Sequence, residues 1–141
     1  MSRSEENISL VRSITKAKNE NDINRLKEFF APEFIAHVSG YEKALTRDEY
    51  LQAFELSHKA FDNFTLSIVD IFATQDKVAV RLIATGRHTG IYQGFEPSYQ
   101  QIEYSGMIMR RIAQGKVIEE WQIIDKLTLL KQIGLSVNHI I

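Results

Sequence analysis

The sequence predicts an α+β fold, in which N-terminal helices pack in a strongly curved antiparallel sheet and leave a conical cavity. Apolar residues recur at helical spacing through the first part of the chain, as in amphipathic helices. From Phe64 to Ile124 they alternate with polar residues, as in strands joined by short turns. Helices followed by hairpin-connected strands are typical of an antiparallel α+β architecture. The length of 141 residues suits one domain, expected to span residues 1–141.

Three helices are expected in the N-terminal part of the chain. In residues 4–19, apolar side chains recur at every third position and form a narrow helical stripe. A second, short helix follows and is closed by Pro32, because proline cannot continue a helix. The third helix is expected from an N-cap at Thr46 to about Phe61, and Glu49 completes a capping box with that threonine.

The sheet is expected to form after Asn63. Its four main strands are predicted at residues 64–71, 78–85, 99–112 and 116–124, with a further short extended segment at 34–38. The glycine-rich segment 86–97 is predicted to be a loop, and Gln114-Gly115 is a hairpin turn. A last helix is predicted at 126–133, where Gly134 stops it.

Composition excludes several classes of protein. A net charge of -1 argues against nucleic acid or an acidic membrane as partner, since both require a clustered basic surface. The absence of cysteine excludes disulfides, thiolate nucleophiles and zinc–thiolate sites. Neither a signal peptide nor a membrane-spanning run is visible, so we expect a soluble, cytoplasmic protein. The tail 135–141 is expected to be poorly ordered.

The four histidines do not form a metal-binding pattern. None is paired with another at the spacings that metal sites use, so no metal and no cofactor is expected. His37 ends a short apolar segment and is a candidate to face the cavity. His88 lies at a strand end among glycines, where it is either a loop histidine bonded to nearby backbone or a site residue.

The last predicted strand carries one glutamate on each face. Glu119 shares its face with Trp121, and Glu120 shares the other with Gln122. A count of apolar residues favours burial of the Trp121 face. A glutamate buried in a dry site has a raised pKa and is a candidate acid or base. Asp125, at the strand end, is either the N-cap of the last helix or a catalytic carboxylate.

Several short motifs occur in the order and spacing of a known family. They are Phe30-Ala31-Pro32-Glu33-Phe34, Gly86-Arg87-His88-Thr89-Gly90, Gly94, the segment 111–117, Trp121, Asp125 and Leu129-Leu130-Lys131-Gln132-Ile133-Gly134. With them the chain resembles the SnoaL-like polyketide (ester) cyclases over nearly its whole length. The resemblance implies the cone-shaped nuclear-transport-factor-two-like fold with a deep pocket, and a homodimer that pairs through the sheet. The Glu120–Gln122 face would then line the pocket, and the Trp121 face would meet the partner.

The same resemblance implies a site. The family's cyclases close a ring by intramolecular aldol condensation, with an aspartate as general acid/base and a histidine, a glutamine and an asparagine around the reacting groups. In this chain those four positions carry other residues: Gln122, Ile108, Gly106 and Ala36, respectively. The expected ligand-binding residues are Ala36, His37, Tyr104, Gly106, Ile108 and Gln122. The catalytic candidates are Glu120, His88 and Asp125.

Two functions stay open at this point, together with a third reading. The first is an acid/base enzyme of cyclase or isomerase type, without cofactor, acting on a small apolar carbonyl compound, with Glu120 replacing the missing acid/base group. The alternative is a non-catalytic ligand-binding module that keeps the pocket and has lost the chemistry. The third is an interaction domain that works through the sheet face bearing Trp121.

Overall fold

The computed structural model describes residues 1–137, and its elements follow the predicted order. The elements are α1 (Arg3–Asn19), α2 (Ile23–Phe29), β1 (Phe30–Val38), β2 (Leu45–Thr46), α3 (Arg47–Ala60), β3 (Phe61–Ala73), β4 (Lys77–His88), β5 (Gln101–Ala113), β6 (Lys116–Ile124) and α4 (Lys126–Gln132). His139 and most of the tail 135–141, which the sequence predicts to be poorly ordered, lie outside the described residues.

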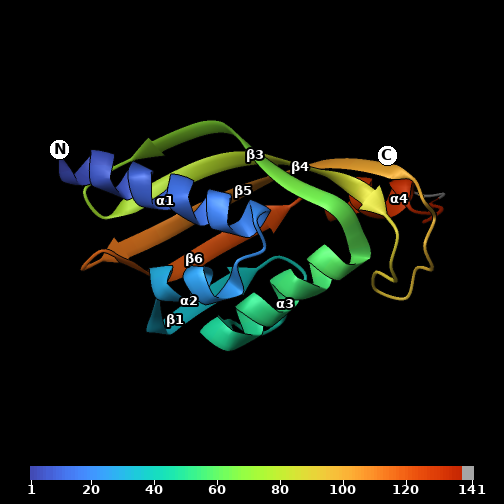
Figure 1. Cartoon of the computed structure of the whole chain (residues 1–141), viewed down its shortest axis with the longest axis horizontal. Coiled ribbons are helices and arrows are strands. Elements are labelled where there is room, and N and C mark those ends of the chain that lie inside the picture. Colours follow the sequence, from blue (N-terminus) through green and yellow to red (C-terminus); the bar gives the residue numbers. More distant parts are fainter. Residues whose placement is uncertain (138–141) are drawn as a thin grey trace.

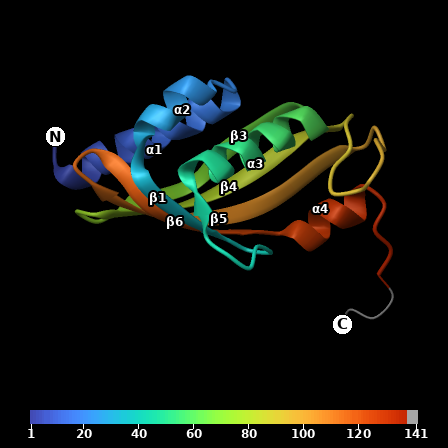
Figure 2. The ribbon, with the colours of Figure 1, turned by 90° about the horizontal axis from the view of Figure 1, so that it is seen from below.

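The strands form one curved, unclosed sheet in the order β2-β1-β6-β5-β4-β3 (Figures 1 and 2). Helices α1, α2 and α3 lie along one side of it, and α4 lies apart from them, at the end next to the loop of residues 89–100 (Figure 2). This confirms the predicted α+β fold with helices in a curved sheet. One pair departs from the antiparallel prediction, because β1 runs parallel to β6. A parallel pair needs a long crossover, which α3 and β3 to β5 provide.

Local sequence signals set most element boundaries. The capping box that starts α3 is complete: Glu49 N donates to Thr46 Oγ1 at 3.3 Å, and Thr46 N donates to Glu49 Oε1 at 2.9 Å. Helix α2 stops at Phe29, earlier than predicted, and the chain enters β1 at Phe30; Pro32 disfavours helical backbone at Ala31, directly before it. Strand β4 extends beyond its predicted end at residue 85 and includes Gly86. A Cβ atom at this position would lie 3.2 Å from the Phe61 Cβ, so the glycine allows the neighbouring strand to approach closely.

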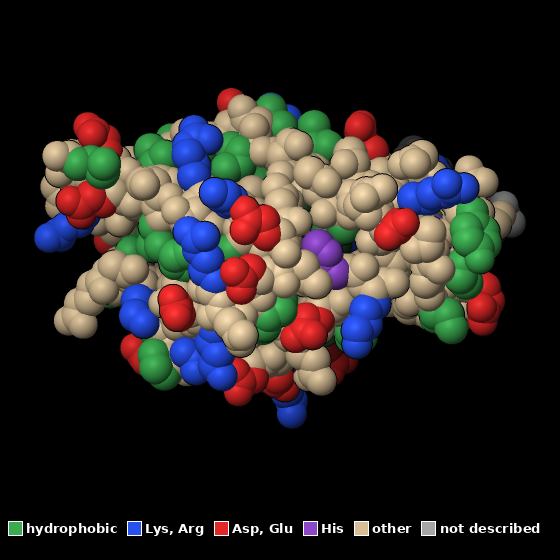
Figure 3. All heavy atoms as spheres, viewed as in Figure 1, with side chains coloured by type: hydrophobic (Ala, Val, Ile, Leu, Met, Phe, Trp, Pro, Cys, Tyr) green, Lys and Arg blue, Asp and Glu red, His purple; other side chains and the backbone are tan. Residues whose placement is uncertain are grey.

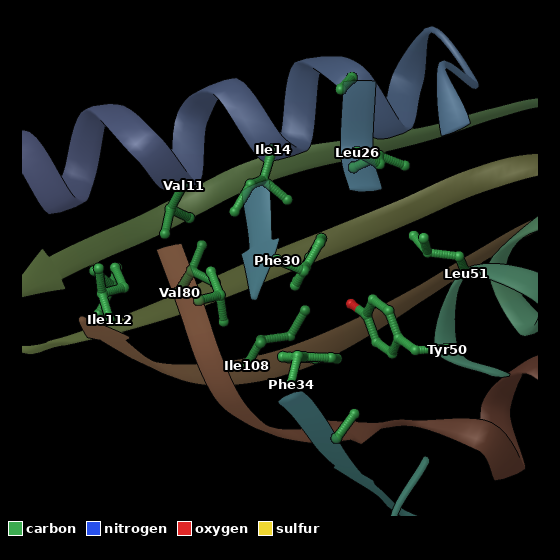
Figure 4. Close-up of a cluster of buried hydrophobic side chains, with 14 of the residues drawn as sticks. Val11, Ile14, Leu26, Phe30, Phe34, Tyr50, Leu51, Val80, Ile108 and Ile112 are labelled. Atoms are coloured by element: carbon green, nitrogen blue, oxygen red, sulfur yellow. The ribbon is translucent and has the colours of Figure 1, made fainter. Parts of the chain in front are cut away.

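Two apolar clusters form the core. The larger lies between α1 to α3 and the inner face of the sheet, and it contains Val11, Ile14 and Ala17 of the predicted α1 stripe; Figure 4 shows Val11 and Ile14 among its members. Its labelled members in Figure 4 are Val11, Ile14, Leu26, Phe30, Phe34, Tyr50, Leu51, Val80, Ile108 and Ile112. The smaller cluster joins α4 to the far end of the sheet through Leu129, Phe61 and Phe64. Side chains from both clusters border the cavity described below.

A β-bulge decides which side chains of β6 face the core. Val117 pairs with Ile112 but Glu119 pairs with Arg111, so Ile118 is an extra residue in β6. Val117 is therefore buried in the core, and after the bulge it is Glu120 that points inward. The prediction from the apolar count, that the Trp121 face is buried, is wrong. The face that the family resemblance predicts, Glu120 with Gln122, is the inner one.

The outside of the molecule carries both signs of charge. On the face viewed in Figure 1, basic and acidic side chains are interspersed (Figure 3). Within residues 1–137, no helix is both long enough and apolar enough to cross a membrane.

Candidate functional site

A cavity of about 130 Å³ lies between α3 and the inner face of the sheet. Its wall is mostly apolar and is formed by Val38, Leu45, Ala53, Phe54, Phe64, Leu66, Leu82, Ala84, Ile108 and Ile124. Tyr92 and Gln93 come from the loop after β4. An apolar cavity of about 150 Å³ holds benzene in another protein, so this one has room for a small organic molecule. A few polar side chains in an apolar wall are typical of small-molecule sites.

Lys18 brings a buried amine to this cavity. It follows Ile14 by four residues, which places it on the buried face of α1, and it is only 4% exposed. Its Nζ donates to the Tyr50 hydroxyl at 2.7 Å and lies 5.0 Å and 5.4 Å from the ring centroids of Tyr50 and Phe54. Within residues 1–137 it forms no salt bridge. Burial, followed by the charge of Arg110, lowers the pKa of Lys18 to about 7, although Glu120 opposes this shift.

Arg110 and Glu120 form an ion pair that is buried beside the cavity and not part of its wall. Arg110 Nε donates to Glu120 Oε1 at 2.7 Å, and the side chains are 1% and 0% exposed. Burial opposes the charge of Arg110, but the opposite charge of Glu120 and the nearby Tyr50 outweigh it and raise the Arg110 pKa. Glu120 does point inward, as predicted, but it is matched to a cation rather than free in a dry pocket.

Tyr50 connects the amine to the ion pair. Its ring belongs to the main core (Figure 4), and its hydroxyl accepts the hydrogen bond from Lys18. Burial raises the pKa of Tyr50 well above its ordinary value, and the charge of Glu120 adds to that shift. The phenol therefore keeps its proton at neutral pH. Glu120 and Arg110 lie close enough to Tyr50 to shift its pKa, so Lys18, Tyr50, Glu120 and Arg110 form one buried polar group, of which Lys18 and Tyr50 line the cavity.

Four of the six predicted ligand-binding residues lie in the cavity wall: Tyr104, Gly106, Ile108 and Gln122. Ala36 is buried in the main core and does not border the cavity. The prediction for His37 is wrong, because side chains alternate along β1 and Ala36 takes the inward direction. His37 lies on the outer face, where its Nε2 is 2.8 Å from Glu119 Oε2 and its ring stacks on Trp121.

All three catalytic candidates lie outside the cavity wall, and two of them, His88 and Asp125, have structural partners. His88 is fully buried, and its Nδ1 accepts a hydrogen bond from Ser98 N at 3.0 Å. Asp125 is the N-cap of α4 and accepts from Thr128 N at 3.1 Å and Thr128 Oγ1 at 2.6 Å. These bonds lower the Asp125 pKa. For both residues the structure supports the structural alternative, so neither enters the function proposed below.

Sequence reasoning missed two members of the polar group, although both carried a signal. Lys18 continues the α1 stripe one turn after Ile14, and Arg110 shares the inner face of β5 with Ile108 and Ile112. In each case a charged residue stands at a position that the periodicity assigns to the core. Within residues 1–137, no three His, Asp or Glu side chains gather closely enough to hold a metal ion.

Comparison with known proteins agrees with this architecture. AclR, a candidate hydroxylase from Streptomyces galilaeus, is similar with a TM-score of 0.86 and 25% identity over 93% of this chain and 97% of that one. IdmH, a candidate polyketide cyclase from Streptomyces antibioticus, has a TM-score of 0.82 and 27% identity over 90% and 97%. A candidate SnoaL-like polyketide cyclase from Jannaschia sp. CCS1 shares the fold, with a TM-score of 0.87 and 18% identity over 97% of both chains.

A search of curated proteins found no match. The family model described as SnoaL-like polyketide cyclase matches residues 8–133. That match includes all of the described sheet, α2 to α4 and most of α1. The chain therefore belongs to the SnoaL-like polyketide cyclase family.

Proposed function

We propose that this protein binds a small, largely apolar carbonyl compound in the cavity and catalyses proton transfer on it, as a cyclase- or isomerase-type enzyme without a cofactor. The observation that carries this proposal is the Lys18–Tyr50 pair in a mostly apolar wall. An amine with a pKa of about 7 is present in both protonation states at neutral pH, which is what a general acid/base requires.

Four polar side chains of the cavity wall have roles in the proposal. Neutral Lys18 removes a proton from the carbon next to the carbonyl, and Tyr50 holds the amine in place. Gln122 and Tyr104 lie in the wall as donors toward the carbonyl oxygen, where negative charge develops. Burial raises the pKa of Tyr104, which keeps its hydroxyl protonated. Glu120 acts as a positioning residue through its pair with Arg110, not as the acid/base group.

A second candidate function is a ligand-binding module without turnover. The replacement of the family's acid/base aspartate by Gln122 favours it, because an amide cannot shuttle a proton. The likeness to AclR and IdmH supports no choice of chemistry, since those two proteins carry different activity names at similar identity.

Deuterium exchange tests the proposal directly. Wild-type protein is incubated with small ketones and 1,3-diketones in D₂O, and loss of the α-hydrogen signal is followed by NMR. We expect acceleration of about 10²-fold or more over buffer. Lys18→Met removes the base and should return the rate to background, whereas Lys16→Met, at an exposed lysine of the same helix outside the wall, should keep it. Binding without exchange would favour the module, and neither binding nor exchange would overturn both functions.

We also propose that two copies pair through the outer sheet face that bears Trp121. Met109 is opposite Trp121 and Met107 is opposite Ile123, so these four side chains are neighbours on β5 and β6. Met107 is 63% exposed and Ile123 is 69% exposed, which leaves an apolar patch for a partner. Sedimentation should show a dimer that Trp121→Ala converts to a folded monomer. A wild-type monomer at high protein concentration would exclude this pairing.

A further inference from the structure

The position of the Lys18 amine gives it a chemical property beyond proton transfer. It is the buried lysine of the cavity wall, and its Nζ lies against two aromatic rings and one hydroxyl. We infer that Lys18 is a nucleophile that forms a Schiff base with an aldehyde or ketone held in the cavity. This inference rests on the carbonyl ligand of the proposed function and adds a covalent intermediate to it.

The surroundings of the amine favour its neutral, nucleophilic form. Within residues 1–137, no carboxylate pairs with Lys18, and the nearest acid of the polar group, Glu120, is bound to Arg110. Within residues 1–137, an ammonium ion in this position loses hydration and gains the Tyr50 oxygen and the faces of the Tyr50 and Phe54 rings, but no carboxylate partner, in return. Desolvation next to another cation is an established way to activate a lysine as a nucleophile. The pKa of about 7 agrees with this geometry.

The reaction balances without any further reagent. The Nζ lone pair attacks the carbonyl carbon, a C–N bond forms, and the carbonyl π electrons move to oxygen. The C–O bond then breaks, and oxygen leaves as water with one proton from Nζ and one from the Tyr50 hydroxyl. The resulting iminium ion loses a proton from its α-carbon, and that proton returns to the Tyr50 oxygen. The sum is amine plus ketone giving enamine plus water, and the enamine carbon is a nucleophile suited to aldol-type bond formation.

Pentane-2,4-dione is a suitable probe, because its product with a lysine amine is a conjugated enaminone that absorbs in the near ultraviolet. Folded wild-type protein is incubated with it at pH 7, and the labelled residue is located by peptide mapping. At this pH a lysine with a pKa of 7 has roughly a thousandfold more neutral amine than an ordinary lysine. We expect labelling at Lys18 to exceed that of surface lysines by at least roughly tenfold.

Variants and a mapping experiment complete the test. Lys18→Met and Lys18→Arg should lose the absorbing adduct, and Lys16→Met should keep it, because Lys16 is on the same helix but is exposed and outside the cavity wall. If a Lys18 variant does not fold, the wild-type peptide map still decides the question. A map that places the label on surface lysines or the N-terminal amine, with Lys18 unlabelled, would overturn the inference.

The two proposals fail in different ways. Exchange of α-hydrogens without any adduct at Lys18 would leave the acid/base function standing and would exclude the Schiff base. An adduct at Lys18 without exchange would keep the nucleophile and exclude acid/base turnover. Binding of the diketone, detected by NMR, with neither adduct nor exchange would overturn both.

Discussion

Two basic side chains, Arg110 and Lys18, are buried in the same polar group, and they differ in their partners. Arg110 is paired with Glu120 at 2.7 Å, whereas Lys18, within residues 1–137, has the Tyr50 hydroxyl at the same distance and no carboxylate. A guanidinium cannot lose its proton in a protein, so a buried arginine needs a counter-ion. A desolvated amine can lose its proton and become neutral, and the pKa of Lys18 is about 7. The one carboxylate of this polar group, Glu120, therefore pairs with Arg110. Lys18, which has no carboxylate partner within residues 1–137, is the basic residue that borders the cavity.

The charge of Arg110 therefore has a structural role, whereas the amine of Lys18 is available for proton transfer. The ion pair is fixed and closed to the cavity, and its Arg110 charge helps to keep the neighbouring amine neutral. The amine is open to the cavity and titrates in the range where proton transfer is useful. Variants that remove one partner at a time should reveal the difference as a difference in stability.

The largest effect is expected from Glu120→Gln. The change leaves the Arg110 guanidinium buried without its counter-ion, and loss of one partner from a buried pair costs about 3–5 kcal/mol of unfolding free energy. Urea unfolding measures the loss. Glu119→Gln is the matched control, because the neighbouring glutamate pairs with His37 and Arg111 on the outer face and should cost about 1 kcal/mol or less. Equal losses in the two variants would contradict the assignment.

An effect of intermediate size is expected from Lys18, whose shifted pKa makes the free energy of unfolding depend on pH. Its pKa is about 7 in the folded state and near its ordinary value of 10.5 in the unfolded chain. Between these values the unfolded chain binds one more proton, so stability rises with pH by ~1.4 kcal/mol per unit. Below pH 7 both states hold the proton, and the full cost of burying the charge is present.

Replacement by methionine should remove that rise. From pH 7.5 to 9.5 the wild type should gain about 2–3 kcal/mol relative to Lys18→Met, measured by urea unfolding at each pH. The difference between the two proteins cancels the contributions of the other titrating groups. The pH range ends below the raised pKa of Tyr50. Parallel stability profiles for the two proteins would show that Lys18 keeps its ordinary pKa in the folded state.

The fold was predictable because it depends on local patterns. Helix caps such as Thr46, the alternation in β4 and the hairpin at Gln114-Gly115 are each encoded by a few neighbouring residues, and all appear in the structure. The parallel pairing of β1 with β6 depends on residues far apart in the chain. The bulge at Ile118 shifts the alternation by one residue, and periodicity alone cannot locate such a shift.

The candidate site was less predictable because it depends on contacts between side chains that are far apart in the sequence. The family motifs led to Gln122 and the wall around Ile108, but they carried no information on Arg110 as the partner of Glu120. Lys18 is 102 positions before Glu120, and only the fold brings α1 and β6 to one polar group. A charged residue inside an apolar stripe was the one local signal that pointed to Lys18.

The smallest effect is expected from Gln122→Leu, which tests whether Arg110 alone satisfies Glu120. Gln122 Nε2 lies 3.4 Å from Glu120 Oε2, a long contact beside the 2.7 Å bond from Arg110. Leucine keeps the volume and makes the cavity wall more apolar, so we expect unfolding free energy to change by less than about 1 kcal/mol. A loss close to that of Glu120→Gln would mean that the amide, not the guanidinium, holds the carboxylate. A small loss with weakened binding of ketones would instead assign Gln122 to the ligand.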